Sequence, residues 1–162
     1  GIMIDTNNFM TKTGVRTFEA AAYLRRNGAD VTRVRKLFRD DMVDYKARAE
    51  AVRHAEVFNS DFAISKFESE GIESPTVVGA QAANELLNIN GIKASFVLTE
   101  YNGKVYISAR SIDEINVQII MERMGGGGHI NIAGAQIPGV SLDEAKQMLT
   151  QTLTNMLKEG EI

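Results

Sequence analysis

Residues 95–110 read Ser-Phe-Val-Leu-Thr-Glu-Tyr-Asn-Gly-Lys-Val-Tyr-Ile-Ser-Ala-Arg, and this stretch decides the fold of the second half of the chain. Two strand-like runs, Ser95–Glu100 and Val105–Arg110, flank the dipeptide Asn102-Gly103. Asn-Gly accepts the left-handed backbone conformation that a two-residue hairpin turn requires. The stretch therefore predicts an antiparallel β-hairpin.

Further strands and helices are expected on both sides of this hairpin. Apolar residues that recur at every second position indicate strands, and those that recur at every third or fourth position indicate helices. A proline in a first helical turn and a Ser-x-x-Glu capping box mark two helix starts. The predicted elements are a strand at 62–67, a helix at 74–88, a helix at 117–124, a strand at 135–137 and a terminal helix from 141 onwards. Strands and helices that alternate in this way predict an α/β domain with a mixed sheet.

The first 57 residues show helical periodicity. The predicted helices span 17–26, 32–38 and about 40–56, and the last of these is highly charged and reads as a linker. Between Lys12 and Arg53 there are 11 Lys/Arg and 6 Asp/Glu, whereas the remainder from His54 has 7 and 14. A basic stretch attracts phosphates, although a solvated helix face explains the same pattern. We expect a helical tail and linker at 1–57, followed by a small mixed-sheet α/β domain at 58–162.

Composition indicates an ordinary globular chain. The 162 residues are 44% hydrophobic and 24% charged, with a formal net charge of −3, so a packed core is expected. No cysteine occurs, which excludes disulfides and thiolate metal ligands. No apolar run approaches the roughly 18 residues that cross a bilayer. Gly1-Ile-Met-Ile4 lacks the basic flank of a signal peptide and reads as part of a larger domain.

The sharpest chemical feature is Gly125-Gly-Gly-Gly-His129. Glycines let backbone N–H groups approach an anion closely, and a histidine adds a donor that reaches a phosphoryl oxygen. The alternative is a flexible loop with a bystander histidine. The apolar residues that follow, from Ile130 onwards, argue against a free linker. The motif therefore predicts a phosphate-binding element.

Two further features point to phosphate or metal chemistry. On a strand, Ser108 and Arg110 share one face, and arginine presents a planar fork that suits phosphate oxygens. An arginine at a strand end is also commonly solvated. Asp5 follows an apolar run, where a metal-binding carboxylate is often found, but a helix cap explains it equally.

Four motifs resemble the DHH family of phosphoesterases. Residues 1–9, Gly-Ile-Met-Ile-Asp-Thr-Asn-Asn-Phe, resemble its last metal motif, an apolar strand that ends in Asp-Thr-x-x-Phe, and residues 17–30 resemble the helix that follows. Ser108-x-Arg-Ser111 and Gly125–His129 resemble the signature of the DHH-associated type 1 domain. Residues 116–122, Asn-Val-Gln-Ile-Ile-Met-Glu, are most similar to GdpP-type cyclic-di-AMP phosphodiesterases. The resemblance covers nearly the whole chain.

The resemblance implies a hydrolase that opens cyclic-di-AMP to linear pApA. Two manganese ions, held by aspartates and histidines of the larger DHH domain, would activate the attacking hydroxide. By matching position, Asp5 would be one metal ligand. The residues expected to bind the substrate phosphate are Ser108, Arg110, Ser111, Asn116, Gly126, Gly127, Gly128 and His129.

The chain departs from the family in lacking an Asp-His-His motif, since its only histidines are His54 and His129. We therefore expect a substrate-binding portion that is inactive alone and works with the rest of the DHH domain. Two alternatives stay open: an oligonucleotide phosphoesterase of the nanoRNA or pAp type, and a non-catalytic nucleic-acid-binding module. Further expectations are a cytoplasmic location, a parent protein anchored at the inner face of a bacterial membrane, and a homodimer. The preferred base is left open.

Overall fold

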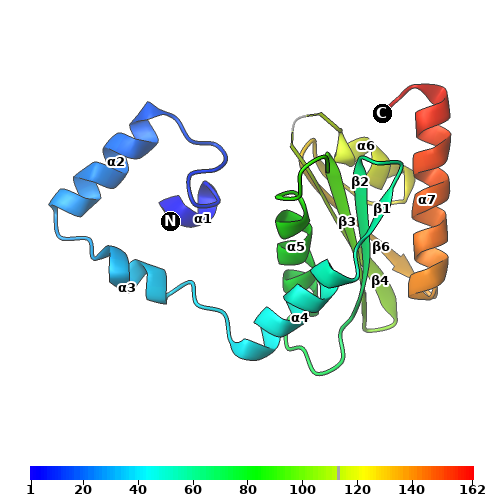
Figure 1. Ribbon diagram of the computed structural model, residues 1–162, viewed down its shortest axis with the longest axis horizontal. Helices are drawn as coiled ribbons and strands as arrows, with labels where there is room; N and C mark the ends of the chain where they lie inside the picture. Colours follow the sequence, from blue (N-terminus) through cyan, green and yellow to red (C-terminus); the bar gives the residue numbers. More distant parts are fainter. Residues whose placement is uncertain (113) are drawn as a thin grey trace. The chain divides into compact units, whose positions relative to one another are not determined.

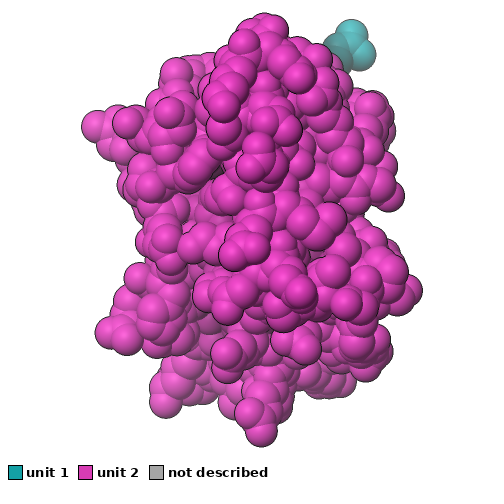
Figure 2. All heavy atoms as spheres, turned by 90° about the vertical axis from the view of Figure 1, so that its right-hand side faces the viewer, with its two compact units in different colours: residues 1–40 teal, residues 41–162 magenta. Residues whose placement is uncertain are grey.

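The computed structural model describes residues 1–112 and 114–162 (Figure 1). Its contacts divide the chain into two compact units, residues 1–40 and 41–162, which Figure 2 colours separately. All strands lie in the second unit. In the described part of the chain, no helix is both long enough and apolar enough to cross a membrane.

The second unit is built on one mixed sheet, which confirms the predicted α/β class. Its strands are β1 (Glu56–Phe58), β2 (Phe62–Glu68), β3 (Ala94–Tyr101), β4 (Lys104–Ser111), β5 (Gly127–His129) and β6 (Ile132–Pro138). Its helices are α4 (Met42–Arg53), α5 (Pro75–Leu86), α6 (Val117–Arg123) and α7 (Leu142–Glu159). The strand order is β1-β2-β3-β4-β6-β5. Strands β2 and β3 are parallel and joined through α5, as a parallel crossover requires, and the other pairs are antiparallel.

The predicted hairpin is confirmed as β3–β4. Tyr101 pairs with Lys104 across the turn. Asn102 and Gly103 adopt φ values of 51° and 71°, the pair of left-handed conformations that the Asn-Gly dipeptide predicts. The hairpin occupies the middle of the sheet, so that β4 is free to pair with β6 on its other side.

Helices cover both faces of the sheet (Figure 1). On one face, α6 and α7 bury the larger core, which includes Phe96, Leu98, Ile107, Leu149 and Leu153. On the opposite face, α5 packs on β3 and β4 around a smaller core that includes Val78, Ala82, Leu86 and Val97. Alternation along each strand sends side chains to these two cores in turn.

Helix α4, which the charge pattern indicated as a linker, belongs to the second unit and packs against α5. Asp41 caps its first-turn amides, as expected of the residue before a helix. Ala51 is 2% exposed, and Arg48 forms an ion pair of 3.1 Å with Glu85 of α5. The compact second unit therefore begins at Asp41, and the domain division at 57/58 stays a prediction.

The first unit contains three helices: α1 (Ile2–Asp5), α2 (Val15–Arg26) and α3 (Val31–Lys36). The resemblance implied an apolar strand at residues 1–5, but these residues form one helical turn. Residues 1–40 offer no second strand for pairing, and a lone strand would leave its backbone groups without partners. None of the three helices buries a side chain, and several large apolar residues are exposed, including Val15, Phe18, Leu24 and Leu37.

The cap of α7 leads to a first testable prediction. Ser141 accepts a hydrogen bond from the Glu144 amide, and the Glu144 carboxylate accepts one from the Ser141 amide at 2.8 Å. Ser141→Ala should lower the free energy of unfolding by about 1 kcal/mol, because it leaves a first-turn amide without its acceptor. Urea denaturation measures this change. The exposed Gln147→Ala in the same helix should be near neutral, and equal losses in both variants would contradict the capping account.

Candidate phosphate-binding site

Strand β4 carries its polar residues on one face, as predicted. Val105, Ile107 and Ala109 point into the core with α6 and α7. Tyr106, Ser108 and Arg110 point to the face on which α5 lies and are half-buried. The polar face of β4 is thus directed toward α5.

The glycine segment is a strand rather than the loop that its composition suggested. Gly127–His129 forms β5, which pairs only with β6 and is the edge of the sheet. The amides of Gly125 and Gly126 donate to the carbonyls of Glu122 and Met121, and so close the end of α6. An edge strand directs part of its backbone N–H groups away from the sheet, so β5 has backbone donors that do not pair within the sheet.

The register of three strands aligns the predicted phosphate ligands in two rows on the α5 face. Residues directly opposite one another in an antiparallel pair share a face. One row contains Arg110 on β4, Ile132 on β6 and His129 on β5. The next row contains Ser108, Gly134 and Gly127 in the same strand order.

In the second of these rows only Ser108 has a side chain, so backbone atoms form its surface on β6 and β5. Gly134 and Gly127 carry no side chains, and a Cβ added at Gly127 would meet no atom within 4 Å. Arg110 and His129 flank the glycines from the neighbouring row. We name Ser108, Arg110, Gly127, Gly128 and His129 the cradle. Because neighbouring strands lie about 4.8 Å apart, the backbones of Arg110 and His129 are about 10 Å apart, with Ile132 of β6 between them.

Arg110 is a cation without a carboxylate partner among the residues that the structure describes. Its Nε donates to Asn84 Oδ1 on α5 at 3.0 Å, and its Nη1 donates to the Ala109 carbonyl at 2.9 Å. Desolvation by burial lowers the pKa of the guanidinium below its ordinary value. Arginine nevertheless stays charged at pH 7. A half-buried guanidinium that lacks a carboxylate partner is suited to bind an anion.

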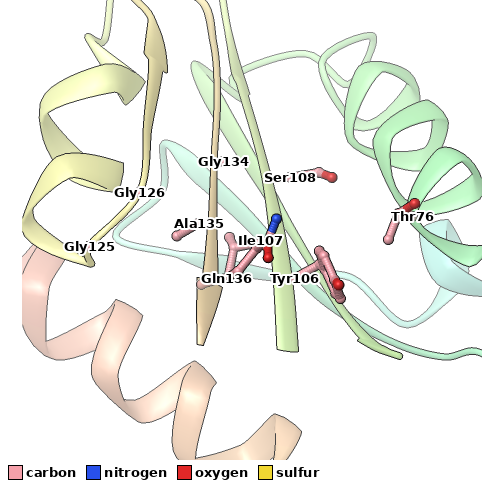
Figure 3. Close-up of a pocket in the computed structure, with 9 residues that line it drawn as sticks. All are labelled: Thr76, Tyr106, Ile107, Ser108, Gly125, Gly126, Gly134, Ala135 and Gln136. Carbon is pink, nitrogen blue, oxygen red and sulfur yellow. The ribbon is translucent and has the colours of Figure 1, made fainter. Parts of the chain in front are cut away.

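A cavity of about 500 Å³ lies on this face (Figure 3). It is lined by Thr76, Tyr106, Ile107, Ser108, Gly125, Gly126, Gly134, Ala135 and Gln136. Two predicted site residues, Ser108 and Gly126, are among them. The side chain of Ser108 extends from β4 toward α5, which carries Thr76 (Figure 3).

The sequence interpretation did not include Tyr106, Gln136 or Thr76 among the site residues, although it noted Tyr106 as a hairpin aromatic that either stacks on a base or packs in the fold. Tyr106 was within reach, because it lies two residues before Ser108 and therefore shares its face. Gln136 and Thr76 could not be predicted from the sequence, because only the pairing of β4 with β6 and the packing of α5 bring them to the cavity.

Two predicted ligands have other partners. Ser111 is 6% exposed and alternates to the face opposite Arg110, where its hydroxyl donates to the Ile130 carbonyl. The Asn116 side chain accepts from the Gln118 amide at 3.0 Å and caps α6. The structure thus does not bring these two residues into the cradle.

The predicted metal ligand Asp5 ends α1 and is exposed. Among the described residues, no group of three or more His, Cys, Asp or Glu side chains is arranged to hold a metal ion. Manganese takes several oxygen or nitrogen ligands. One carboxylate does not form such a set, so the described residues do not fit a resident manganese ion by themselves.

Fold and site together define a class: a mixed-sheet α/β domain that presents a glycine edge strand, an arginine and a histidine on one face. The family profile of the DHHA1 domain matches residues 60–155, more than half of the chain. The chain therefore belongs to the DHHA1 domain family. The match includes every residue of the cradle.

Known relatives agree with this assignment. The cyclic-di-AMP phosphodiesterase GdpP of Geobacillus thermodenitrificans is 42% identical over 161 residues, which are 99% of this chain and 24% of that protein. The cyclic-di-AMP phosphodiesterase PdeA of Listeria monocytogenes is 42% identical over 154 residues, 94% of this chain and 23% of that protein. The chain thus spans about a quarter of the length of these relatives.

A solved structure shares the fold. The exopolyphosphatase-related protein from Bacteroides fragilis superposes with a TM-score of 0.84 at 21% identity, over 96% of this chain and 48% of that one. At this identity the similarity concerns the fold alone. It extends over both compact units of the chain.

Proposed function

We propose that this chain is the substrate-binding portion of a manganese-dependent phosphodiesterase that hydrolyses cyclic-di-AMP to pApA. The observation that carries the proposal is the half-buried Arg110, which has no carboxylate partner in the described chain and lies in one row with His129. The names of the relatives supply the substrate. In this proposal the cradle binds a phosphate through Arg110, His129 and the outward amides of β5.

The cradle contributes binding and orientation rather than bond cleavage. A guanidinium and a histidine donor neutralise and orient a phosphodiester, which holds its phosphorus in a fixed position for attack. Manganese would supply the nucleophilic hydroxide when bound. Its ligands would come from the larger DHH domain, with Asp5 as one of them.

The first unit supports a partner domain in the same protein. It exposes apolar side chains such as Phe18, Leu24 and Leu37. When exposed apolar residues form a patch, that patch is typical of a contact surface. We propose that the rest of the DHH domain covers them. A membrane anchor in the parent protein, a cytoplasmic location for this portion, and a homodimer remain part of the proposal.

Titration of the ¹⁵N-labelled chain with cyclic-di-AMP, pApA and a four-nucleotide RNA tests this function. We expect the amide signals of Gly127, Gly128 and His129 to shift with cyclic-di-AMP and pApA. Tighter binding of the RNA than of either dinucleotide would favour the oligonucleotide phosphoesterase or a nucleic-acid-binding module. Shifts confined to residues outside the cradle would overturn the proposal.

A further inference from the structure

We propose that Tyr106 and Gln136 form a nucleobase subsite beside the cradle, and that this subsite prefers adenine. The proposal rests on the proposed function, because it assigns the base end of a ligand whose phosphate the cradle holds. Neither residue belongs to the motifs that identified the family.

The two residues are adjacent on the sheet. Tyr106 on β4 lies directly opposite Gln136 on β6, which places their Cβ atoms about 5 Å apart on one face. Both line the same cavity as Ser108 and Gly126 (Figure 3). The row Tyr106–Gln136 follows the row Ser108–Gly134 along the strands.

The spacing of the rows suits one nucleotide. Two residues of a strand span about 7 Å, so the Tyr106–Gln136 row lies about 7 Å from the Ser108–Gly134 row. The Arg110–His129 row lies about 7 Å beyond that. A nucleotide whose phosphate lies between the Ser108–Gly134 row and the Arg110–His129 row would reach Tyr106 with its base if its ribose extended along the strands in that direction.

The polar side chains in this part of the cavity are not used in hydrogen bonds that stabilise the fold. Thr76, Tyr106, Ser108 and Gln136 make no side-chain hydrogen bond to any residue that the structure describes. The Tyr106 ring is held by Tyr101, whose centroid lies 6.3 Å away at an interplanar angle of 49°. A supported aromatic ring and several unused polar groups that converge on one cavity are the usual composition of a ligand site.

The chemistry of the pair matches a base. A tyrosine ring offers a stacking surface to any nucleobase. A glutamine amide has one acceptor and one donor side by side, which complement the amino group and ring nitrogen of adenine. Guanine presents two acceptors on the corresponding edge, so a glutamine satisfies it less well.

Tyr106 is tested by comparing a ligand that has bases with one that has none. Nuclear magnetic resonance titration of the 162-residue chain should show that Tyr106→Leu binds pApA about tenfold more weakly and ribose 5-phosphate with unchanged affinity. Tyr106→Phe keeps the ring and should bind pApA like the unaltered chain. Arg110→Ala should weaken both ligands.

Gln136 is tested by base selectivity, and its exposed position makes a folding defect in Gln136→Ala unexpected. The unaltered chain should bind AMP several-fold more tightly than GMP, and Gln136→Ala should bring the two affinities together. Binding of pApA and ribose 5-phosphate that depends on Arg110 but is unchanged in Tyr106→Leu and Gln136→Ala would overturn the subsite and leave the cradle standing. No binding of any of these ligands by the unaltered chain would overturn the proposed function, and the subsite with it.

Discussion

Arg110→Ala is expected to weaken binding of pApA to this chain by about 10- to 100-fold. The substitution removes the one half-buried guanidinium of the cradle, and hydrogen bonds to charged groups each contribute about 1.5–3 kcal/mol. Arg110 has no carboxylate partner among the described residues, so its loss leaves no buried anion behind. Stability should therefore change much less than affinity. Calorimetric titration and thermal melting of the same samples separate the two effects.

Lys158→Ala is the matched control for this prediction. It also removes one positive charge, but Lys158 is exposed on α7, which covers the opposite face of the sheet. It should bind pApA like the unaltered chain. If both variants lost the same affinity, the effect would be one of net charge, and Arg110 would have no specific place in the site. The pApA affinity of Asn84→Ala should lie between those of Arg110→Ala and Lys158→Ala, because the charge of Arg110 remains but its hydrogen bond to α5 is lost.

Gly126→Ala is expected to destabilise the second unit by about 3 kcal/mol, at the upper end of the cost of overpacking. A Cβ at this position would overlap the Gly134 carbonyl oxygen and would lie 2.6 Å from the Ala135 Cα. Both of these are backbone atoms of β6, so no side-chain rotation relieves the clash. Strand β5 would have to separate from β6, which would also move the cradle amides.

Gly127→Ala provides the comparison, because a Cβ there meets no atom within 4 Å and the residue has no positive φ. Its denaturation midpoint should stay within experimental error of the unaltered chain. Guanidinium chloride unfolding of both variants measures the difference. Equal midpoints for Gly126→Ala and the unaltered chain would refute the close approach of β5 to β6.

The glycine motif illustrates the difference between what the sequence indicated and what the structure added. Four consecutive glycines indicated bare amides next to an anion, and the edge strand β5 is compatible with that reading. The sequence did not indicate that Gly126 is also required for close packing on Gly134, because these residues come together only through the β5–β6 pairing. The close packing at Gly126 was therefore not visible before the structure, and anion binding by the glycine amides stays a prediction.

Local signals account for the elements that were predicted well. The Asn102-Gly103 turn, the Ser141 cap and the alternation of β4 all depend on interactions within a few residues. Strand β1 was missed because its three residues carry no periodic signal and are ordered by pairing with β2. Ser111 and Asn116 were placed in the site by motif alone, and their hydrogen bonds are made to the Ile130 carbonyl and the Gln118 amide.

By itself, the sequence determined the class of the fold, the central hairpin and the shared face of Ser108 and Arg110, because backbone turn preferences and period-two alternation are local properties. The tertiary structure decided that β4 pairs with β6, that Arg110 meets Asn84 and lies in one row with His129, and that Tyr106 lies beside Gln136. Those contacts depend on the register between strands that are distant in the chain. Register is fixed by burying one face of the whole sheet at once, and no short stretch of residues specifies it.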